Sequence, residues 1–450
     1  MSAALVLSPP APPAAARQPG QNGQPDFAEA GREAARILTD LVRLDTTNPP
    51  GREELVAAYL AELLDREGIT YLRLARDEGR DNLVARYHGA GRGRPILLYS
   101  HSDVVPADAG WGGWTVDPFA GEVKNGCLYG RGAVDAKGLL VCHLEALLLL
   151  KRGNVPLDRD VIFLAAAAEE TGGGPGVAWL LREHRDLLDA GTALGEGGRV
   201  WSEDGVVRSV WLQAGEKSAH NLTVTATGTA GHASVPTERN AAERLVRALD
   251  RMLEVRLPRR INPVSREFLR RMVRVDPRVR KGKPRYTAIT RSTFTITSLE
   301  SGVKSNVIPP VARANLNLRL LPGEDLEAVT ALLQAAARDT AVHVRHRPGA
   351  VNGATLVPFE TPFFDTLSAV ASRRWPGAVV APYLSPGTSD ASKLRRAGIL
   401  TYGLMPFPLE EGEDTGVHGA DERIDLEALS EGVRLTYEIL LAWAGGERAR

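Results

Sequence analysis

Residues 95–106, PILLYSHSDVVP, decide the fold class of this chain. The stretch begins with a nearly continuous apolar run over residues 95–100, which predicts a strand that is covered on both faces of its sheet. A second buried strand is predicted over residues 159–168, and a short one over residues 192–194. Because helical patterns lie between these runs, we expect an α/β sandwich.

The helical spacing of apolar residues predicts the layers that cover these strands. Helices are predicted over residues 30–44, 53–67 and 136–152, and a further helix is expected over residues 426–444. Asp135 stands directly before the third of these helices, where its side chain is placed to cap the helix start.

The middle of the chain follows a different pattern. Residues 221–228, 290–298 and 313–320 alternate apolar and polar side chains, as half-exposed strands do, and helices are predicted over residues 241–255 and 326–338. A β-α-β-β-α-β order of this kind makes a small antiparallel sheet backed by helices. We therefore expect a second domain that is inserted into the first.

Composition excludes several classes of protein. The 450 residues carry 55 basic and 55 acidic side chains, so no overall field attracts nucleic acid or an anionic membrane. No run of about 20 apolar residues occurs without charges, and the N-terminal residues lack the pattern of a secretory signal. We expect no nucleic-acid partner, no membrane partner and a cytoplasmic protein. The two cysteines, Cys127 and Cys142, are too few for a disulfide framework or a cysteine-based metal site.

Side chains that can bind a metal follow the predicted strands. In open α/β sheets, ligand-binding groups gather beyond the carboxyl ends of the strands. Four candidates lie at such ends and two lie in glycine-containing segments: His101, Glu169, Glu170 and Glu196, and then Asp135 and His418. Two imidazoles and several carboxylates form a ligand set suited to Zn²⁺ or a similar divalent ion.

Each candidate also has a simpler interpretation. A single histidine after a strand is usually a solvated loop residue, two adjacent glutamates usually form an acidic loop, and Asp135 alone is explained as a helix cap. Their joint placement favours a metal site. Glu169 and Glu170 follow four alanines at residues 165–168, so small side chains bring two carboxylates to the end of a buried strand. That arrangement is costly without a cation.

Four motifs together resemble the M20 family of metallopeptidases. They are SHSDVVP at residues 100–106, YGRGAVDAKG at 129–138, EETG at 169–172 and GTAGHASVP at 228–236. The resemblance runs from about residue 27 to the end of the chain. It implies a zinc-peptidase-like α/β sandwich catalytic domain that is interrupted by a ferredoxin-like α+β lid or dimerisation domain.

The resemblance also implies a division of the chain. The parts are a tail over residues 1–25 that we expect to be disordered, a first catalytic part over 26–215, a lid or dimerisation domain over 216–346 and a second catalytic part over 347–450.

By position, the resemblance assigns two divalent metal ions to each chain, with Zn²⁺ as the expected metal and Co²⁺ or Mn²⁺ as alternatives. His101 and Glu196 would hold one ion, Glu170 and His418 would hold the other, and Asp135 would bridge them. Three carboxylates plus a bridging hydroxide would neutralise two divalent cations.

The resemblance assigns the remaining roles as well. Asp103 would accept the second ring N–H of His101. Glu169 would be the general base that takes a proton from the metal-bridging water. His232 would reach across to stabilise the oxyanion. The residues that would bind the carbonyl and carboxylate of the substrate are Asn306, Arg319 and the loop of Gly387, Thr388 and Ser389.

These assignments predict a dinuclear metal-dependent hydrolase that cleaves an amide bond next to a free carboxylate. Its substrate would be a small peptide, as in a carboxypeptidase or dipeptidase, or an N-acyl amino acid, as in an aminoacylase, deacetylase or desuccinylase. A non-catalytic metal-bound binding protein is the alternative from a different class. We expect a homodimer formed through the inserted domain.

Overall fold

The computed structural model describes residues 24–107, 113–281, 284–347, 353–410 and 415–446. The tail that we expected to be disordered lies outside these ranges, apart from its last two residues. Among the described helices, none combines the length and the apolar character needed to cross a membrane.

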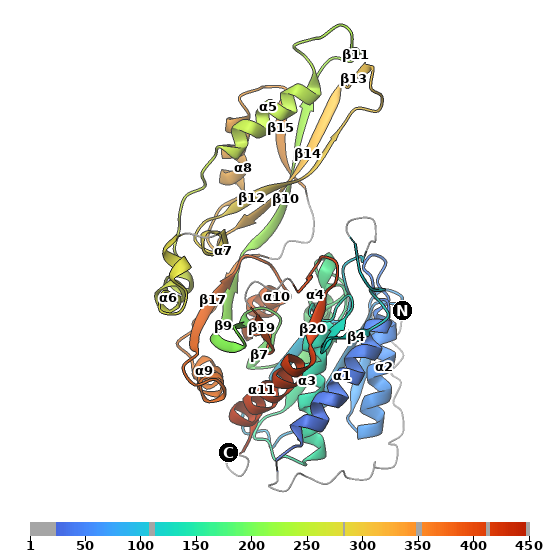
Figure 1. Cartoon of the computed structure of the whole chain (residues 1–450), viewed down its shortest axis with the longest axis vertical. Helices are drawn as coiled ribbons and strands as arrows, with labels where there is room; N and C mark the ends of the chain where they lie inside the picture. The colour runs from blue at the N-terminus through green and yellow to red at the C-terminus, as the bar shows by residue number, and fades with distance from the viewer. Residues whose placement is uncertain (1–23, 108–112, 282–283, 348–352, 411–414, 447–450) are drawn as a thin grey trace.

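A large mixed sheet forms the centre of the first domain (Figure 1). Four adjacent strands, β6, β3, β7 and β18, run parallel to one another, so their carboxyl ends meet at one edge. The strands are, in spatial order, β1 (Tyr71–Ala75), β2 (Asp81–Tyr87), β6 (Val161–Ala166), β3 (Ile96–His101), β7 (Thr192–Gly195), β18 (Leu400–Gly403), β9 (Val206–Glu216), β8 (Arg199–Glu203) and β19 (Pro408–Glu410), with β16 (Thr355–Leu356) and β17 (Val379–Ser385) paired to β9.

Helices cover both faces of this sheet, which confirms the predicted α/β sandwich. Along β3, Ile96 and Leu98 pack into one core, whereas Leu97 and Tyr99 pack into the other. The first core is covered by α1 (Phe27–Arg43), α2 (Glu53–Glu67), α3 (Lys137–Arg152), α9 (Pro362–Arg374) and α11 (Leu426–Ala444), and the second by α4 (Val177–Glu183) and α10 (Ala391–Arg396). Figure 1 shows α1, α2, α3 and α11 side by side.

The predicted helix cap at Asp135 is wrong. Helix α3 begins at Lys137, and Ala136 occupies its N-cap position without a side-chain hydrogen bond. The carboxylate of Asp135 instead contacts the ring nitrogens of His101 and His418. The side chain is therefore directed into the site at the edge of the sheet and not back to the helix.

The inserted domain, which we call the lid domain, has the predicted β-α-β-β-α-β order. Its antiparallel sheet has the strand order β12 (Thr293–Ser301), β14 (Val311–Leu320), β10 (Ser218–Thr227) and β15 (Val342–Arg347). Helices α5 (Ala241–Leu253) and α8 (Leu326–Ala337) pack on one face of it. A separate two-stranded ribbon of β11 (Gly231–His232) and β13 (Val307–Ile308) lies at the end of the lid domain farthest from the large sheet (Figure 1).

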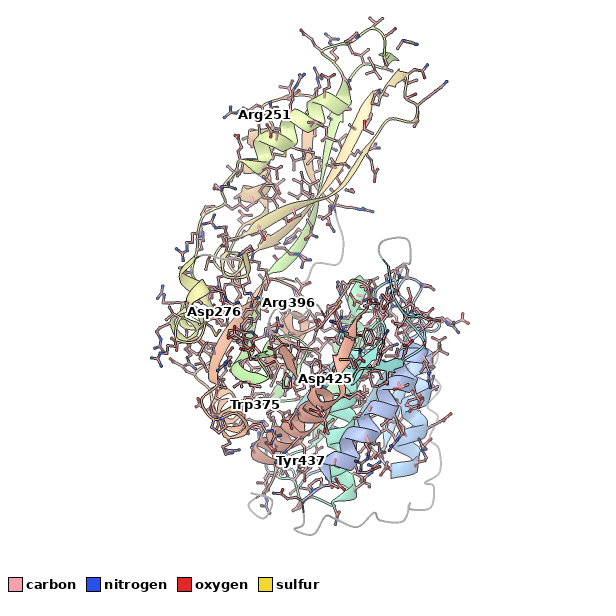
Figure 2. All side chains as sticks on the ribbon, in the orientation of Figure 1. Arg251, Asp276, Trp375, Arg396, Asp425 and Tyr437 are labelled. Atoms are coloured by element: carbon pink, nitrogen blue, oxygen red, sulfur yellow. The ribbon has the colours of Figure 1, made fainter. Side chains whose placement is uncertain are left out.

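An arginine-rich segment of the inserted region packs against the large sheet. It contains α6 (Pro263–Met272), η4 (Pro277–Lys281) and α7 (Pro284–Ala288). The Phe268 ring lies 5.1 Å from the rings of Trp211 and Tyr383, on strands β9 and β17. Asp276, labelled in Figure 2, is buried and accepts hydrogen bonds from Tyr286 and Arg278. This segment therefore packs into the core of the first domain.

Candidate metal centre

The predicted ligands lie at the carboxyl ends of three neighbouring parallel strands. His101 is the last residue of β3, and Glu196 directly follows β7. Glu169 and Glu170 begin the short helix η2 (Glu169–Thr171), three residues after the end of β6. Because β3 pairs with both β6 and β7, all four side chains reach the same edge of the sheet.

The first group of ligands consists of His101, Asp135 and Glu196. His101 Nε2 lies 3.1 Å from Asp135 Oδ1 and 3.8 Å from Glu196 Oε2. One ligand atom from each residue lies within 4.8 Å of the other two. His101 is buried, so its ring is held in place by the end of the strand.

The second group consists of Asp135, Glu170 and His418. His418 Nε2 lies 3.1 Å from Asp135 Oδ2 and 3.4 Å from Glu170 Oε1. Asp135 therefore presents one carboxylate oxygen to each group. His418 comes from the loop before β20 (Arg423–Asp425) and has a positive φ of 58°, which turns the chain sharply at this point.

The two groups fit divalent metal ions. Ligand atoms about 2.0–2.2 Å from a tetrahedral Zn²⁺ lie roughly 3.3–3.6 Å apart. The four distances given above, 3.1, 3.8, 3.1 and 3.4 Å, are close to this spacing. Within the described chain, the buried Oε1 of Glu170 has the 3.4 Å contact with His418 but no hydrogen bond of good geometry, as expected for an oxygen that binds a cation. A bound pair of ions would polarise an amide carbonyl and activate water.

The pKa values of the ligand side chains also indicate that a cation would stabilise this site. Burial raises the pKa of Glu196 well above its ordinary value, and the charge of Asp135 raises it further. Hydrogen bonds to Asp135 and Glu170 raise the pKa of His418 to about 10. Burial would lower the pKa of His101, but hydrogen bonds to Asp103 and Asp135 raise it well above its usual range. The imidazoles thus take up positive charge in compensation for the carboxylates.

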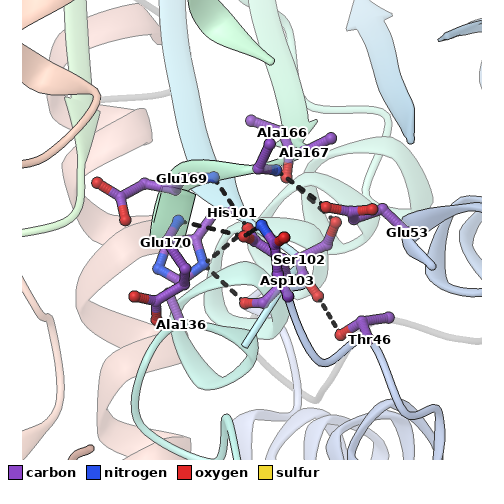
Figure 3. A network of polar contacts seen from close by, with 12 residues as sticks. Thr46, Glu53, His101, Ser102, Asp103, Ala136, Ala166, Ala167, Glu169 and Glu170 are labelled. Atoms are coloured by element: carbon purple, nitrogen blue, oxygen red, sulfur yellow. Dashed lines mark hydrogen bonds and ion pairs between the residues drawn. The ribbon is translucent and has the colours of Figure 1, made fainter. Parts of the chain in front are cut away.

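Asp103 organises the residues around the first ligand group (Figure 3). Its carboxylate accepts hydrogen bonds from the backbone N–H groups of Glu169 and Glu170, each at 3.1 Å, and from Asn48 Nδ2 at 2.7 Å. The ring of His101 contacts Asp103 differently from the prediction. Its Nδ1 lies 2.9 Å from the Asp103 backbone oxygen and 3.5 Å from the carboxylate.

The carboxylate of Glu169 points away from this network, while its N–H group remains bound to Asp103 (Figure 3). Burial raises the pKa of Glu169 well above its ordinary value, and the charge of Glu196 adds to the effect. Glu53 stabilises the same turn. It accepts a hydrogen bond from the N–H of Ala168 at 3.0 Å and forms a two-point ion pair with Arg80.

Glu422 was not predicted from the sequence. This buried carboxylate accepts the N–H groups of Gly132, Val134 and Asp135, each at 2.9 Å, and Nη1 of Arg131 at 2.7 Å. Nη2 of the same arginine donates to the Gly419 carbonyl at 2.7 Å, so Glu422 ties the Asp135 segment to the His418 loop. The sequence feature that points to Glu422 is its position four residues after the predicted ligand His418.

The lid-domain residues that were predicted to contact the substrate lie in two different places. His232 and Asn306 lie together on the distal ribbon, where Ala233 N–H donates to the Asn306 carbonyl at 3.0 Å. His232 is exposed and its Nδ1 contacts Ser234 Oγ at 2.7 Å. This ribbon is remote from the large sheet of the same chain (Figure 1), so His232 and Asn306 are not brought to the metal ligands.

Arg319 and the loop of Gly387, Thr388 and Ser389 lie nearer to the ligands. Arg319 is half-buried at the base of β14, within electrostatic reach of Glu169. Gly387 N–H donates to Ser385 Oγ, and Ser389 N–H and Oγ contact Glu216. Within the described chain, Thr388 N–H has no acceptor and is the one free donor of the three.

The fold and the site together define a metal-dependent hydrolase of amide bonds. The model of peptidase family M20/M25/M40 matches residues 97–442, which is most of the chain, and the chain belongs to this family.

Curated relatives cover most of the chain at moderate identity. An N-fatty-acyl-amino acid synthase/hydrolase from Homo sapiens is 28% identical over 77% of this chain and 74% of its own length. Aminoacylase-1 from Sus scrofa is 27% identical over 93% of this chain and 98% of its own length.

Solved structures share the fold. An M20 family metallo-carboxypeptidase, Sso-CP2 from Sulfolobus solfataricus, has a TM-score of 0.72 at 19% identity and covers 91% of this chain and 98% of its own. A dinuclear metal binding peptidase of the M20 family from Bacillus subtilis has a TM-score of 0.59 at 15% identity, with 92% and 99% covered.

Replacing Glu422 tests its role in holding the two ligand segments together. In Glu422→Gln, an amide N–H₂ group would face backbone N–H groups that now donate to a carboxylate oxygen. We expect metal affinity to fall about 10- to 100-fold, the scale for residues that orient metal ligands. Competition with a fluorescent chelator measures this affinity. The exposed Glu427→Gln is the matched control, and equal affinities in the two variants would contradict the assignment.

Proposed function

We propose that the chain is a dinuclear metal-dependent hydrolase that cleaves an amide bond adjacent to a free carboxylate. The observation that carries this proposal is the pair of ligand groups that share Asp135 through different carboxylate oxygens. His101 and Glu196 would hold one ion, and Glu170 and His418 the other. Zn²⁺ suits this set of imidazole and carboxylate ligands, with Co²⁺ or Mn²⁺ as alternatives.

Glu169 is the general base of the proposed reaction. Its carboxylate is free of the Asp103 network and close to the ligand groups, and burial keeps its pKa high, which suits a group that must accept and return a proton near neutral pH. It would take a proton from the attacking water and deliver it to the nitrogen of the leaving amine. Arg319 and the Thr388 N–H would hold the carboxylate of the substrate.

Peptides and N-acyl amino acids both contain the bond that this site would cleave. The names of the human and pig relatives support the N-acyl amino acids, whereas the carboxypeptidase structure shares the fold alone. Hydrolysis of Xaa-Gly dipeptides, N-acetyl amino acids and N-succinyl amino acids, measured in one panel with Zn²⁺, Co²⁺ and Mn²⁺, separates a peptidase from a deacylase. No hydrolysis of any member would contradict the proposal.

We also propose that the chain works as a homodimer in which His232 and Asn306 serve the site of a second copy. Both residues lie on the exposed distal ribbon, away from the ligands of their own chain. Apolar side chains around them are exposed, with Val235 at 69% and Val303 at 98%. A second copy would cover this surface and would bring His232 to the oxyanion.

The two adjacent glutamates should respond differently to substitution. Glu169→Gln keeps the size of the side chain but removes the proton acceptor, so kcat should fall by roughly 10²–10⁴-fold while metal content is kept. Glu170→Gln should lose metal affinity. Kinetics and elemental analysis of both variants test this. If Glu169→Gln retained more than about a tenth of the wild-type kcat, the general-base assignment would be wrong.

Mixing two inactive variants tests whether His232 acts in a second copy. His232→Ala and Glu169→Ala, exchanged into mixed dimers, should form one complete site per dimer. The activity per mixed dimer should recover to at most about half of wild type. His343→Ala, which changes an exposed lid-domain histidine, is the control and should stay active alone. A monomer in solution, or no recovery after demonstrated exchange, would show that His232 serves its own chain.

A further inference from the structure

The arginine-rich segment concentrates positive charge in a chain that has no net charge. Residues 256–285 contain twelve basic and two acidic side chains, so their net charge is +10, whereas the rest of the chain carries −10. The expectation of no membrane partner rested on the total charge and does not account for this distribution. A local charge of this size attracts anionic partners even when the whole chain is neutral.

Helix α6 of this segment has a buried apolar face and an exposed charged face. Its apolar residues recur every four positions and pack in the core of the first domain; they are Val264, Phe268 and Met272. Two positions after each of them comes an arginine, the last in the turn that follows the helix; these are Arg266, Arg270 and Arg274, all exposed. Residues two apart point about 200° away from each other around a helix. The arginines therefore face outward, on the flank of the molecule opposite α1 and α2 (Figure 1).

Several arginines of the segment are exposed and have no ion-pair partner within the described chain. They are Arg256, Arg259, Arg266 and Arg274. By contrast, Arg260 pairs with Glu324 at 2.8 Å, and Arg270 pairs with Glu267 at 2.6 Å. Like charges four residues apart on a helix reduce its stability, so contacts within α6 do not explain the spacing of its outward arginines.

The packing of the segment restricts the kind of anionic partner. Helix α6 lies against β9 and β17 through its apolar face, so it is not free to enter the major groove of duplex DNA. Phe268 is the only aromatic residue among residues 256–285, and it is buried. The segment therefore offers no aromatic platform on which unpaired bases could stack. A broad anionic surface that contacts only the guanidinium ends satisfies both restrictions.

We propose that the arginine-rich segment is a docking surface for an anionic lipid bilayer. Guanidinium groups donate charge-assisted hydrogen bonds to the phosphate groups of anionic phospholipids. Clusters of about four to eight basic residues bind such membranes, and the exposed, unpaired arginines of the segment reach that number. Because the apolar face of α6 stays in the protein core, the binding is electrostatic and peripheral, without insertion of the helix. This inference goes beyond the proposed function and does not depend on it.

Co-sedimentation with lipid vesicles tests the proposal on the whole protein. Vesicles made of equal parts of phosphatidylglycerol and phosphatidylcholine present an anionic surface, and vesicles of phosphatidylcholine alone present a neutral one. We expect the protein to sediment with the anionic vesicles and to stay in solution with the neutral ones. Raising NaCl to about 1 M should abolish the binding, because the Debye length then falls to about 3 Å.

Two double variants identify the surface that binds. Arg266→Gln combined with Arg274→Gln removes two exposed, unpaired arginines and leaves the buried face of α6 intact. We expect the partition coefficient for anionic vesicles to fall about 10- to 30-fold, because each arginine near an anionic surface contributes about fivefold. Arg66→Gln combined with Arg182→Gln removes the same charge from exposed positions on α2 and α4. This matched control should bind as the wild type does.

The proposal fails on any of three results. They are no binding of the wild type to anionic vesicles at low salt, equal binding to anionic and neutral vesicles, and equal partition coefficients of the two double variants. The first two need only the wild type, so the test holds even where a variant does not fold. Duplex DNA replaces the vesicles in a last measurement, and binding to DNA without binding to vesicles would assign the surface to nucleic acid instead.

Discussion

Mutual repulsion of carboxylates at one edge of the large sheet is the constraint on which the rest of the structure depends. Parallel pairing of β3 with β6 and β7 brings Glu169, Glu170 and Glu196 together with Asp135. Two carboxylates 4 Å apart repel by about 4 kcal/mol at an effective dielectric constant of 20, before the cost of burial. Two imidazoles alone do not balance four carboxylates, so bound divalent cations would stabilise this edge of the sheet.

Further buried carboxylates hold the charged segments in position. Asp103 binds the N–H groups of Glu169 and Glu170, and Glu422 binds those of the segment that ends at Asp135. Each therefore uses backbone donors to fix residues whose side chains would otherwise separate. The carboxylates of the candidate ligands thus face the proposed metal position, whereas those of Asp103 and Glu422 hold the ligand segments in place.

Polar residues at the ends of apolar strands are visible in a linear pattern, so the sequence identified the candidate ligands, and the resemblance to the M20 family assigned their roles. Alternating polarity and helical spacing predicted the β-α-β-β-α-β order of the inserted domain, whereas the order of the strands in the large sheet was not predicted. The contacts of Glu422 reach a segment far earlier in the chain, so its place four residues after His418 did not by itself reveal its role. Asp135 was predicted both as a helix cap and as a bridging ligand, because the same residue type suits both roles, and the cap prediction was wrong. The core contacts of Phe268 likewise arise only from tertiary packing.

Metal stoichiometry tests the central claim most directly. The protein is stripped with a chelator, dialysed to equilibrium against buffered Zn²⁺ and measured by elemental analysis. The account predicts saturation at two ions per chain, and a loss of both from Asp135→Asn, because the two ligand groups share this one carboxylate. Saturation of the wild type at a single ion, or loss of only one ion from the variant, would contradict the shared dinuclear centre.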